Sequence, residues 1–99
     1  MRPYAIQFIF EPDISLAEAE MSLHLAMFAV EGLIGRVRVR LDAKYQIKES
    51  LYAIIVDAGS AAGRLIVRIF TALLLREFGE DSFSVERVNH FSVLQSLET

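Results

Sequence analysis

The stretch Leu51-Tyr52-Ala53-Ile54-Ile55-Val56-Asp57-Ala58-Gly59-Ser60, residues 51–60, decides the fold that we expect for this chain. Residues 51–56 form a continuous apolar run, which is typical of a strand in the interior of a sheet. The next four residues have the composition of a turn, and residues 61–78 are rich in good helix formers and end before Gly79. The stretch therefore predicts a central strand that passes directly into a helix.

The N-terminal residues predict a strand followed by a helix. Residues 4–10 are rich in aromatic and β-branched side chains, and Pro12-Asp13 ends this strand. Ser15 and Glu18 have the spacing of a capping box, in which each side chain satisfies a backbone N–H group of the first helical turn. We therefore expect a helix over residues 16–33.

Residues 36–41 read Arg-Val-Arg-Val-Arg-Leu and alternate strictly between charged and apolar side chains. Strict alternation predicts a half-buried strand, because successive side chains of a strand point to opposite faces. We expect Val37, Val39 and Leu41 to face the helices and the three arginines to share the other face. Residues 42–50 are expected to form a polar connection.

The last predicted element is a strand over residues 82–89. The complete order is β-α-β-β-α-β, which predicts an α+β fold of the ferredoxin-like type: a four-stranded antiparallel sheet of order 4-1-3-2 with two helices on one face. At 99 residues the chain has the length of one domain, so we expect residues 1–99 to form a single domain. Residues 91–99 form a C-terminal tail, for which docking on a neighbouring subunit is one expectation.

The composition argues against several classes of protein. Hydrophobic residues make up 54% of the chain and charged residues 23%, which excludes an intrinsically disordered protein. The chain has no cysteine and therefore no disulfide or thiolate metal ligand. The N-terminus lacks a secretory signal pattern, and no apolar run approaches the roughly 20 residues of a membrane span. We expect a cytoplasmic protein with no cofactor, no bound metal and no membrane partner.

The two predicted helices are apolar on more sides than one sheet can cover. In the first helix, a second apolar set lies away from the stripe that packs on the sheet: Ala17, Met21, Leu25 and Phe28. Large exposed apolar patches usually mark an interface. We expect another copy of the chain to cover this set, in a dimer or a larger assembly. The alternative is a pair of core helices with a few exposed apolar side chains, which is common.

Positive charge is concentrated in one segment, although the net charge of the chain is −3. Residues 36–48 contain five basic side chains and one acidic, whereas residues 1–35 contain one basic and five acidic. On a strand, Arg36, Arg38 and Arg40 would be about 6.6–6.8 Å apart, near the spacing of backbone phosphates. This stripe is a candidate site for an anionic ligand. We favour protection of a sheet edge, or ion pairs between subunits, over nucleic acid.

Three further residues are candidates for a small-ligand site. Arg64 follows small residues that open the second helix, where backbone N–H groups attract anions, although ordinary turn chemistry explains the same residues. Antiparallel pairing is expected to bring His90, at the end of the last strand, near Tyr4. Glu20 and His24 share a helix face, a spacing more typical of an exposed pair than of a metal site. We assign no catalytic residue and no metal ligand.

Two known families share parts of this pattern. The RNA-recognition module has the same element order, but its basic-glycine-aromatic signature is missing from residues 49–54, which have one aromatic and no glycine. The element order, Pro3 and the pair Gly63-Arg64 resemble the tautomerase group, trimeric isomerases that use an N-terminal proline amine as base. Pro3 follows Met1-Arg2, so its nitrogen is an amide in the intact chain.

These observations favour a small self-associating domain that binds a ligand or a protein partner without catalysis. The first alternative is a small oligomeric enzyme, similar to the tautomerases, with a pocket between subunits for an acidic substrate. The second alternative is RNA binding on the open face of the sheet. The candidate ligand-binding residues are Tyr4, Arg36, Arg38, Arg40, Arg64 and His90.

Overall fold

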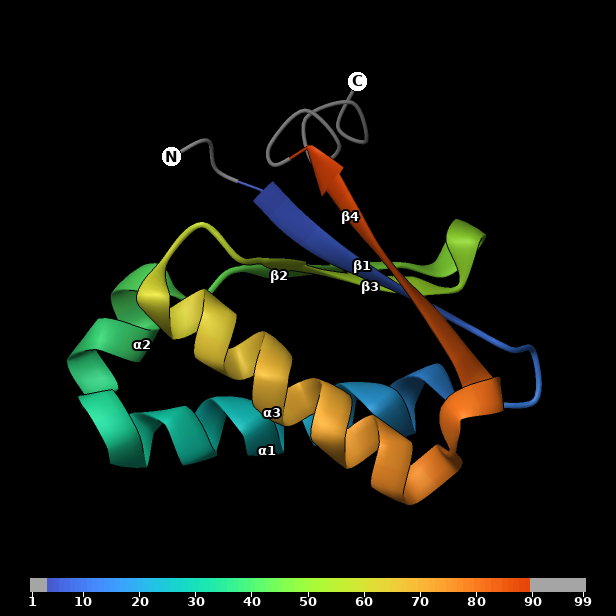
Figure 1. Ribbon diagram of the computed structural model, residues 1–99, viewed down its shortest axis with the longest axis horizontal. Helices are drawn as coiled ribbons and strands as arrows, with labels where there is room; N and C mark the ends of the chain where they lie inside the picture. The colour runs from blue at the N-terminus through green and yellow to red at the C-terminus, as the bar shows by residue number, and fades with distance from the viewer. Residues whose placement is uncertain (1–3, 90–99) are drawn as a thin grey trace.

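A computed structural model describes residues 4–89, which contain both helices and strands (Figure 1). Residues 1–3 and 90–99, and with them Pro3, His90 and the predicted tail, lie outside the described residues. The helices and strands are β1 (Tyr4–Phe10), α1 (Leu16–Ile34), α2 (Arg36–Asp42), β2 (Tyr45–Lys48), β3 (Ala53–Asp57), α3 (Ala61–Phe78) and β4 (Phe83–Asn89). The fold is thus α+β, as predicted, but the described residues form three helices instead of two.

The sheet has four strands in the order β2-β3-β1-β4, and every neighbouring pair is antiparallel. Read from the β4 edge, this is the order 4-1-3-2 that the sequence predicts. β3 is buried at all five of its residues, in agreement with the continuous apolar run. Ile6, Phe8 and Phe10 of β1 pack into the core on the side of the sheet where Figure 1 shows α1 and α3.

Serine and glycine set the boundaries of the two long helices. Ser15 Oγ accepts a hydrogen bond from the backbone N–H three residues on at 3.2 Å, and Ser60 Oγ accepts the equivalent bond at 3.0 Å. The helices end at Gly35 and Gly79, whose φ values are 98° and 90°. Residues with these roles are common at helix ends, so the predicted helices are confirmed to within a residue at each boundary.

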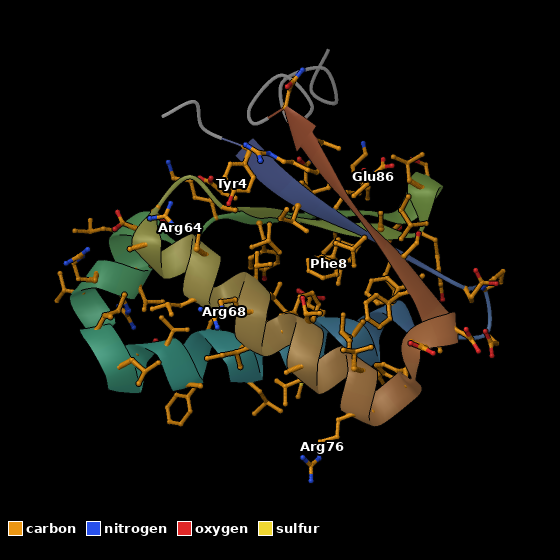
Figure 2. All side chains as sticks on the ribbon, in the orientation of Figure 1. Tyr4, Phe8, Arg64, Arg68, Arg76 and Glu86 are labelled. Atoms are coloured by element: carbon orange, nitrogen blue, oxygen red, sulfur yellow. The ribbon has the colours of Figure 1, made fainter. Side chains whose placement is uncertain are left out.

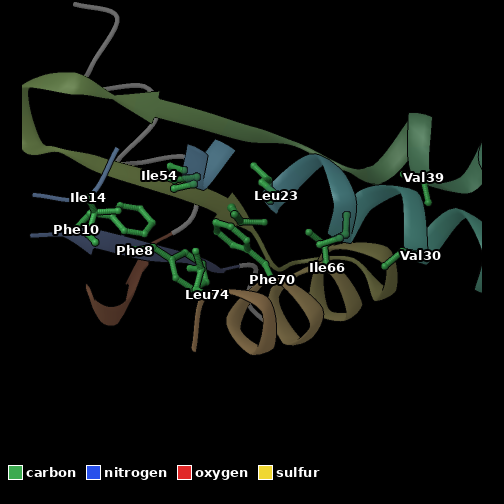
Figure 3. Close-up of a cluster of buried hydrophobic side chains, with 13 residues drawn as sticks. Phe8, Phe10, Ile14, Leu23, Val30, Val39, Ile54, Ile66, Phe70 and Leu74 are labelled. Carbon is green, nitrogen blue, oxygen red and sulfur yellow. The ribbon is translucent and has the colours of Figure 1, made fainter. Parts of the chain in front are cut away.

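The hydrophobic core lies between the sheet and the long helices (Figure 3). Phe8 of β1 contacts Phe70 of α3, with ring centroids 4.7 Å apart and planes inclined by 64°. Such edge-to-face contacts stabilise a core beyond the area that they bury. Ser22 of α1 is buried too, and its hydroxyl donates to Glu77 Oε1 on α3 at 2.7 Å. The buried cluster comprises Phe8, Phe10, Ile14, Ala19, Leu23, Ala26, Val30, Val39, Ile54, Val56, Ile66, Phe70 and Leu74.

The predicted strand over residues 36–41 is wrong, because this segment forms the helix α2. Of its three apolar side chains, Val39 is 2% exposed and belongs to the core, whereas Val37 and Leu41 are each 70% exposed. The prediction that all three face the helices is therefore also wrong. A helix brings residue 39 to one side and residues 37 and 41 to the opposite side, since successive residues are 100° apart.

The predicted stripe of three arginines on one strand face is lost with the strand. Arg36 and Arg40 are four residues apart and lie on the same side of α2. Arg38 lies on another side, where its Nε is 3.8 Å from a carboxylate oxygen of Asp42. The arginines therefore do not form a row at phosphate spacing.

The alternation of residues 36–41 is compatible with a helix because only one side chain in it has to be buried. Arginine and leucine are good helix formers, and Gly35 lets the chain turn sharply from α1 into α2. The strand beside β3 is Tyr45–Lys48, inside the predicted connection. Its own alternation places Tyr45 and Ile47 opposite core residues of β3, so this segment takes the place of the predicted strand.

The start of α3 approaches the end of β3 more closely than a side chain permits. A Cβ atom on Gly63 would lie 2.0 Å from the carbonyl oxygen of Asp57. The turn between them is closed by the backbone N–H of Gly59, which donates to Asp57 Oδ1 at 2.8 Å. The small residues in this turn therefore serve the junction between strand and helix.

Replacing Gly63 with alanine is expected to lower the free energy of unfolding by about 1–3 kcal/mol, because the new methyl group forces α3 away from β3. At Gly32 of α1 a Cβ meets no atom within 4 Å, so Gly32→Ala is expected to raise the stability by about 0.5–1 kcal/mol. Urea unfolding measures both. A Gly63→Ala variant as stable as the wild type would contradict the close approach.

The helical register of α2 is tested by paired substitutions. Val39→Asp is expected to lower the free energy of unfolding by about 3–5 kcal/mol or to unfold the chain, because it buries an unpaired charge. In a single copy, Val37→Asp places the charge in solvent in the first turn of a helix, where carboxylates are favourable, and is expected to change the stability of the monomer by less than about 0.5 kcal/mol. In a strand both residues would face the core, so equal losses in thermal unfolding would refute the helix.

Candidate functional site

A pocket of about 200 Å³ opens between β1 and the N-terminal half of α3. Two residues of β1, the turn before α3 and one side of α3 line it. These residues are Tyr4, Ile6, Ala58, Arg64, Val67 and Arg68. Figure 2 shows Tyr4 at the start of β1 and the two arginines along the first turns of α3. The lining of the pocket is thus largely apolar, and two of the residues that form it are arginines.

Backbone geometry holds the two sides of this pocket together. The N–H of Ala58 donates to the carbonyl oxygen of Tyr4 at 2.9 Å, which ties the turn before α3 to the start of β1. Tyr4 and Ile6 share a face of β1 because strand side chains alternate. Arg64 and Arg68 are four residues apart and so extend from the same side of α3.

A third guanidinium lies beside the pocket. Arg87 of β4 is opposite Ile6 of β1 in the sheet, and its Cζ lies 3.9 Å from the centroid of the Tyr4 ring. A guanidinium at this distance over an aromatic face is attracted by the ring and restrains it. Three arginines from two separate elements therefore surround Tyr4 and the mouth of the pocket.

The two arginines of α3 stand where the helix alone disfavours them. Like charges four residues apart destabilise an isolated helix by about 0.2–0.5 kcal/mol, and Arg64, near the N-terminus of α3, also opposes the helix dipole. Within residues 4–89, no carboxylate forms an ion pair with Arg64 or Arg68. Arg64 Nη1 donates only a long hydrogen bond, 3.5 Å, to the carbonyl oxygen of Ala58. A bound anion would offset this positive charge.

The pocket brings together two of the residues that the sequence analysis selected, Tyr4 and Arg64. Arg36, Arg38 and Arg40 belong to α2 and do not line it, and His90 lies outside the described residues. Arg68 and Arg87 were not predicted as site residues from the sequence. The spacing of Arg68 from Arg64 was a usable signal, whereas Arg87 is recognisable only from its register with Ile6.

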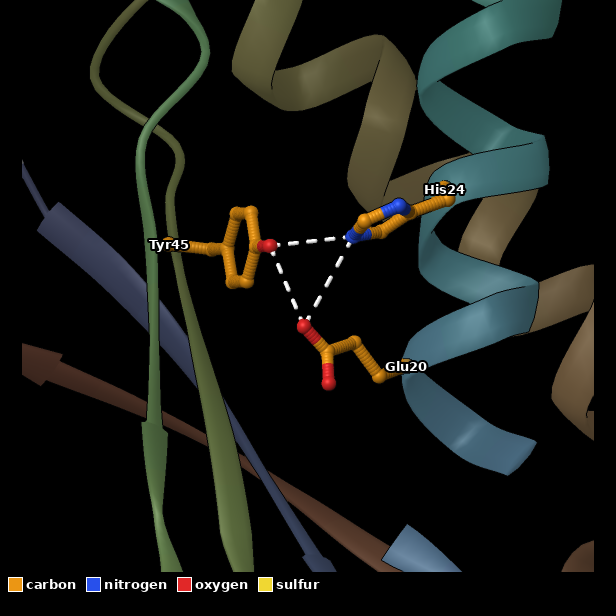
Figure 4. Close-up of polar contacts among 3 residues, drawn as sticks. All are labelled: Glu20, His24 and Tyr45. Carbon is orange, nitrogen blue, oxygen red and sulfur yellow. Dashed lines mark hydrogen bonds and ion pairs between the residues drawn. The ribbon is translucent and has the colours of Figure 1, made fainter. Parts of the chain in front are cut away.

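A second polar cluster joins α1 to β2 (Figure 4). The hydroxyl of Tyr45 lies 3.0 Å from His24 Nε2 and donates to Glu20 Oε2 at 3.3 Å. His24 Nε2 and Glu20 Oε2 are 3.7 Å apart. Glu20 and His24 were predicted to share a helix face, and the structure adds Tyr45 from the edge strand as their common partner.

This cluster supports the position of the edge strand. Its groups are only partly buried, and the side chain of His24 is 54% exposed. Burial raises the pKa of Tyr45, and the charge of Glu20 and the hydrogen bond to it raise the pKa further. Among residues 4–89, no group of three or more acidic or histidine side chains has the arrangement of a metal site. The cluster thus anchors β2 on α1 through hydrogen bonds.

Within residues 4–89, the face of the sheet opposite the helices has no aromatic residue on its two central strands on which RNA bases could stack. The central strands are β1 and β3, and the aromatic residues of β1 that pack in the core, Phe8 and Phe10, lie on the helix side. The other face carries Gln7, whose Nε2 donates to Glu86 Oε1 at 2.9 Å. Base stacking in the manner of the RNA-recognition module has no platform on these strands.

Comparison with protein families, with curated proteins and with solved structures finds no match for this chain. None of the three helices in the described range is long and apolar enough to cross a membrane.

The raised pKa of Tyr45 predicts a loss of stability at alkaline pH. The unfolded chain ionises this phenol near pH 10, before the folded chain does. The contribution of Tyr45 to the free energy of unfolding is therefore fully present below that pH and is lost as the pH rises above it. Tyr45→Phe lacks this titration, so its stability should fall less than that of the wild type between about pH 8 and about pH 11. Urea unfolding at both pH values measures the difference, and identical losses would contradict the assignment.

Proposed function

We propose that this chain is a non-catalytic binding module that takes a small anion in the pocket between β1 and α3. The proposal rests on the position of Arg64 and Arg68, which line a concave site with apolar walls. Neither arginine forms an ion pair with a carboxylate among residues 4–89. Guanidinium groups bind carboxylates and phosphates through paired hydrogen bonds. Arg87, held over Tyr4, adds positive charge beside the same opening.

The size of the pocket limits the ligand. A volume of about 200 Å³ lies below the roughly 300–1,000 Å³ of typical small-molecule sites. A ligand of this size has one or two anionic groups and a short apolar body, which Ile6 and Val67 contact. Small carboxylates, dicarboxylates and inorganic phosphate fit this description.

The lining residues favour binding over catalysis. General acid–base catalysis requires a group whose pKa lies near the working pH, most often an imidazole or a carboxyl. The lining residues contain neither of these two groups, and Tyr4 is the one described lining residue whose side chain serves as a general acid or base in some enzymes. The enzyme alternative would therefore depend on Tyr4 at this pocket.

We propose that the sheet order and the placement of α1 and α3 make this a ferredoxin-like domain with α2 as an added helix. The order β2-β3-β1-β4 supports this description, and the short helix α2 occupies the region where the second strand was expected. A cytoplasmic location remains our expectation from the absence of cysteine.

Anion binding is tested by calorimetry and thermal unfolding with phosphate, succinate and acetate. We expect saturable binding by the wild type and a melting temperature that rises with anion concentration, since a ligand of the folded state stabilises it. Arg68→Ala is expected to weaken binding roughly tenfold or more, because each charge-assisted hydrogen bond is worth about 1.5–3 kcal/mol. Arg76→Ala, in the last turn of the same helix, is the matched control and should bind as the wild type.

Two outcomes would refute the proposal. One is the absence of any stabilisation by the three anions, and the other is equal binding by the Arg68→Ala and Arg76→Ala variants. A short single-stranded RNA is included in the same measurement. Salt-sensitive binding of that RNA, lost in Arg68→Ala and unaffected by phosphate, would replace the small-anion proposal with nucleic-acid binding.

A further inference from the structure

The outer side of α1 presents apolar side chains to solvent. Met21, Leu25 and Phe28 are 66%, 59% and 72% exposed. They lie opposite the buried side of α1 and form one continuous stripe, because their spacing of three and four residues returns to the same side of a helix. Acidic residues border the stripe on both sides, with Glu18 on one and Glu31 on the other. We call this set the α1 patch.

The outer side of α2 also has exposed apolar side chains between charged residues, but here the charges are positive. Val37 and Leu41 are each 70% exposed and lie four residues apart, opposite the buried Val39. Arg36 and Arg40 border them on one side, and Arg38 lies on the other. We call this set the α2 patch.

We propose that the α2 patch of one copy of this chain packs on the α1 patch of a second copy. Val37 and Leu41 would then cover the stripe of Met21, Leu25 and Phe28, while the arginines of α2 meet the glutamates of α1. Burial of apolar surface drives such association, and complementary charge fixes which helix meets which. This inference is independent of the anion pocket, whose lining residues belong to other elements.

The charges around the two patches favour contact of α2 with α1 over contact between two like patches. A contact between two α1 patches would bring glutamates together, and a contact between two α2 patches would bring arginines together; both are unfavourable. The two patches cannot meet within one chain as it is folded, because each is turned away from the core that buries the other side of its helix. If both contacts join the same two copies, the assembly is a dimer with two-fold symmetry; if they join different copies, it is a ring or a longer chain.

The proposed contact would explain why acidic residues are concentrated in the first part of the chain and basic residues in the segment that follows it. Residues 1–35 are acidic and residues 36–48 are basic, and the boundary falls at the turn between α1 and α2. Val37 and Leu41 are also poor choices for a helix surface unless something covers them. A large exposed apolar patch on a monomer is a liability for aggregation, so its presence between charged borders points to an interface.

The test is the native mass of the chain in solution with charges reversed on one patch at a time. By analytical ultracentrifugation, the wild type is expected to associate at micromolar concentration. The variant Arg36→Glu/Arg40→Glu carries acidic charge on both patches, and Glu18→Arg/Glu31→Arg carries basic charge on both. Each is expected to weaken association roughly tenfold or more. An equimolar mixture of the two is expected to regain it, because every contact is again complementary.

Matched controls separate this pairing from other causes. Arg76→Glu changes an exposed charge on α3 outside both patches and should associate as the wild type. Phe28→Ser should dissociate the assembly and leave the circular dichroism spectrum unchanged, since its side chain is 72% exposed in one copy. A wild type that stays monomeric up to about 100 µM, well above the Kd of specific assemblies, overturns the proposal. So does a mixture of the reversed variants that fails to recover the wild-type mass.

Discussion

The close approach of α3 to the end of β3 is the constraint on which the rest of the structure depends. Gly63 has no Cβ, so the first turn of the helix can lie directly against the carbonyl oxygen of Asp57. From this start, α3 runs beneath the sheet so that Phe70 meets Phe8 in the core. The same start places Arg64 on the side of the helix that faces β1. Core and pocket thus follow from one junction.

Much of the fold was predictable because its signals are local. Ser15 and Ser60 cap the long helices with their own side chains, and the apolar run of β3 can only lie inside a sheet. The alternation of residues 36–41 is not a local signal of that kind. A helix of seven residues that buries only Val39 satisfies the same pattern, and the choice depends on which segment pairs with β3. Tyr45–Lys48 takes the position beside β3 that residues 36–41 were predicted to fill, and this choice depends on tertiary contacts.

The candidate site was predictable only in part, for a related reason. Tyr4 and Arg64 stand at element boundaries, where sequence patterns are clear, and the pocket includes both. Arg87 joins them only because β4 pairs with β1 in one register out of several. Tyr45 similarly meets Glu20 and His24 across a gap that no spacing in the sequence encodes. Residues brought together by strand register are invisible until the pairing is known.

Positive charge in this chain is placed where local rules give no reason for it. Arg64 lies near the N-terminus of α3 and repels Arg68, and Arg36 opens α2 and repels Arg40, although Arg40 itself lies in the last turn, where the helix dipole favours a cation. A natural sequence that breaks a local rule at two places is best explained by something outside the helix that offsets the cost. On α3 a concave pocket lies beside the charges, which suits a small anion. On α2 an exposed apolar side accompanies them, which suits an acidic, apolar helix such as α1. The shape beside each charge pair, concave in one case and convex in the other, therefore decides which kind of ligand it takes.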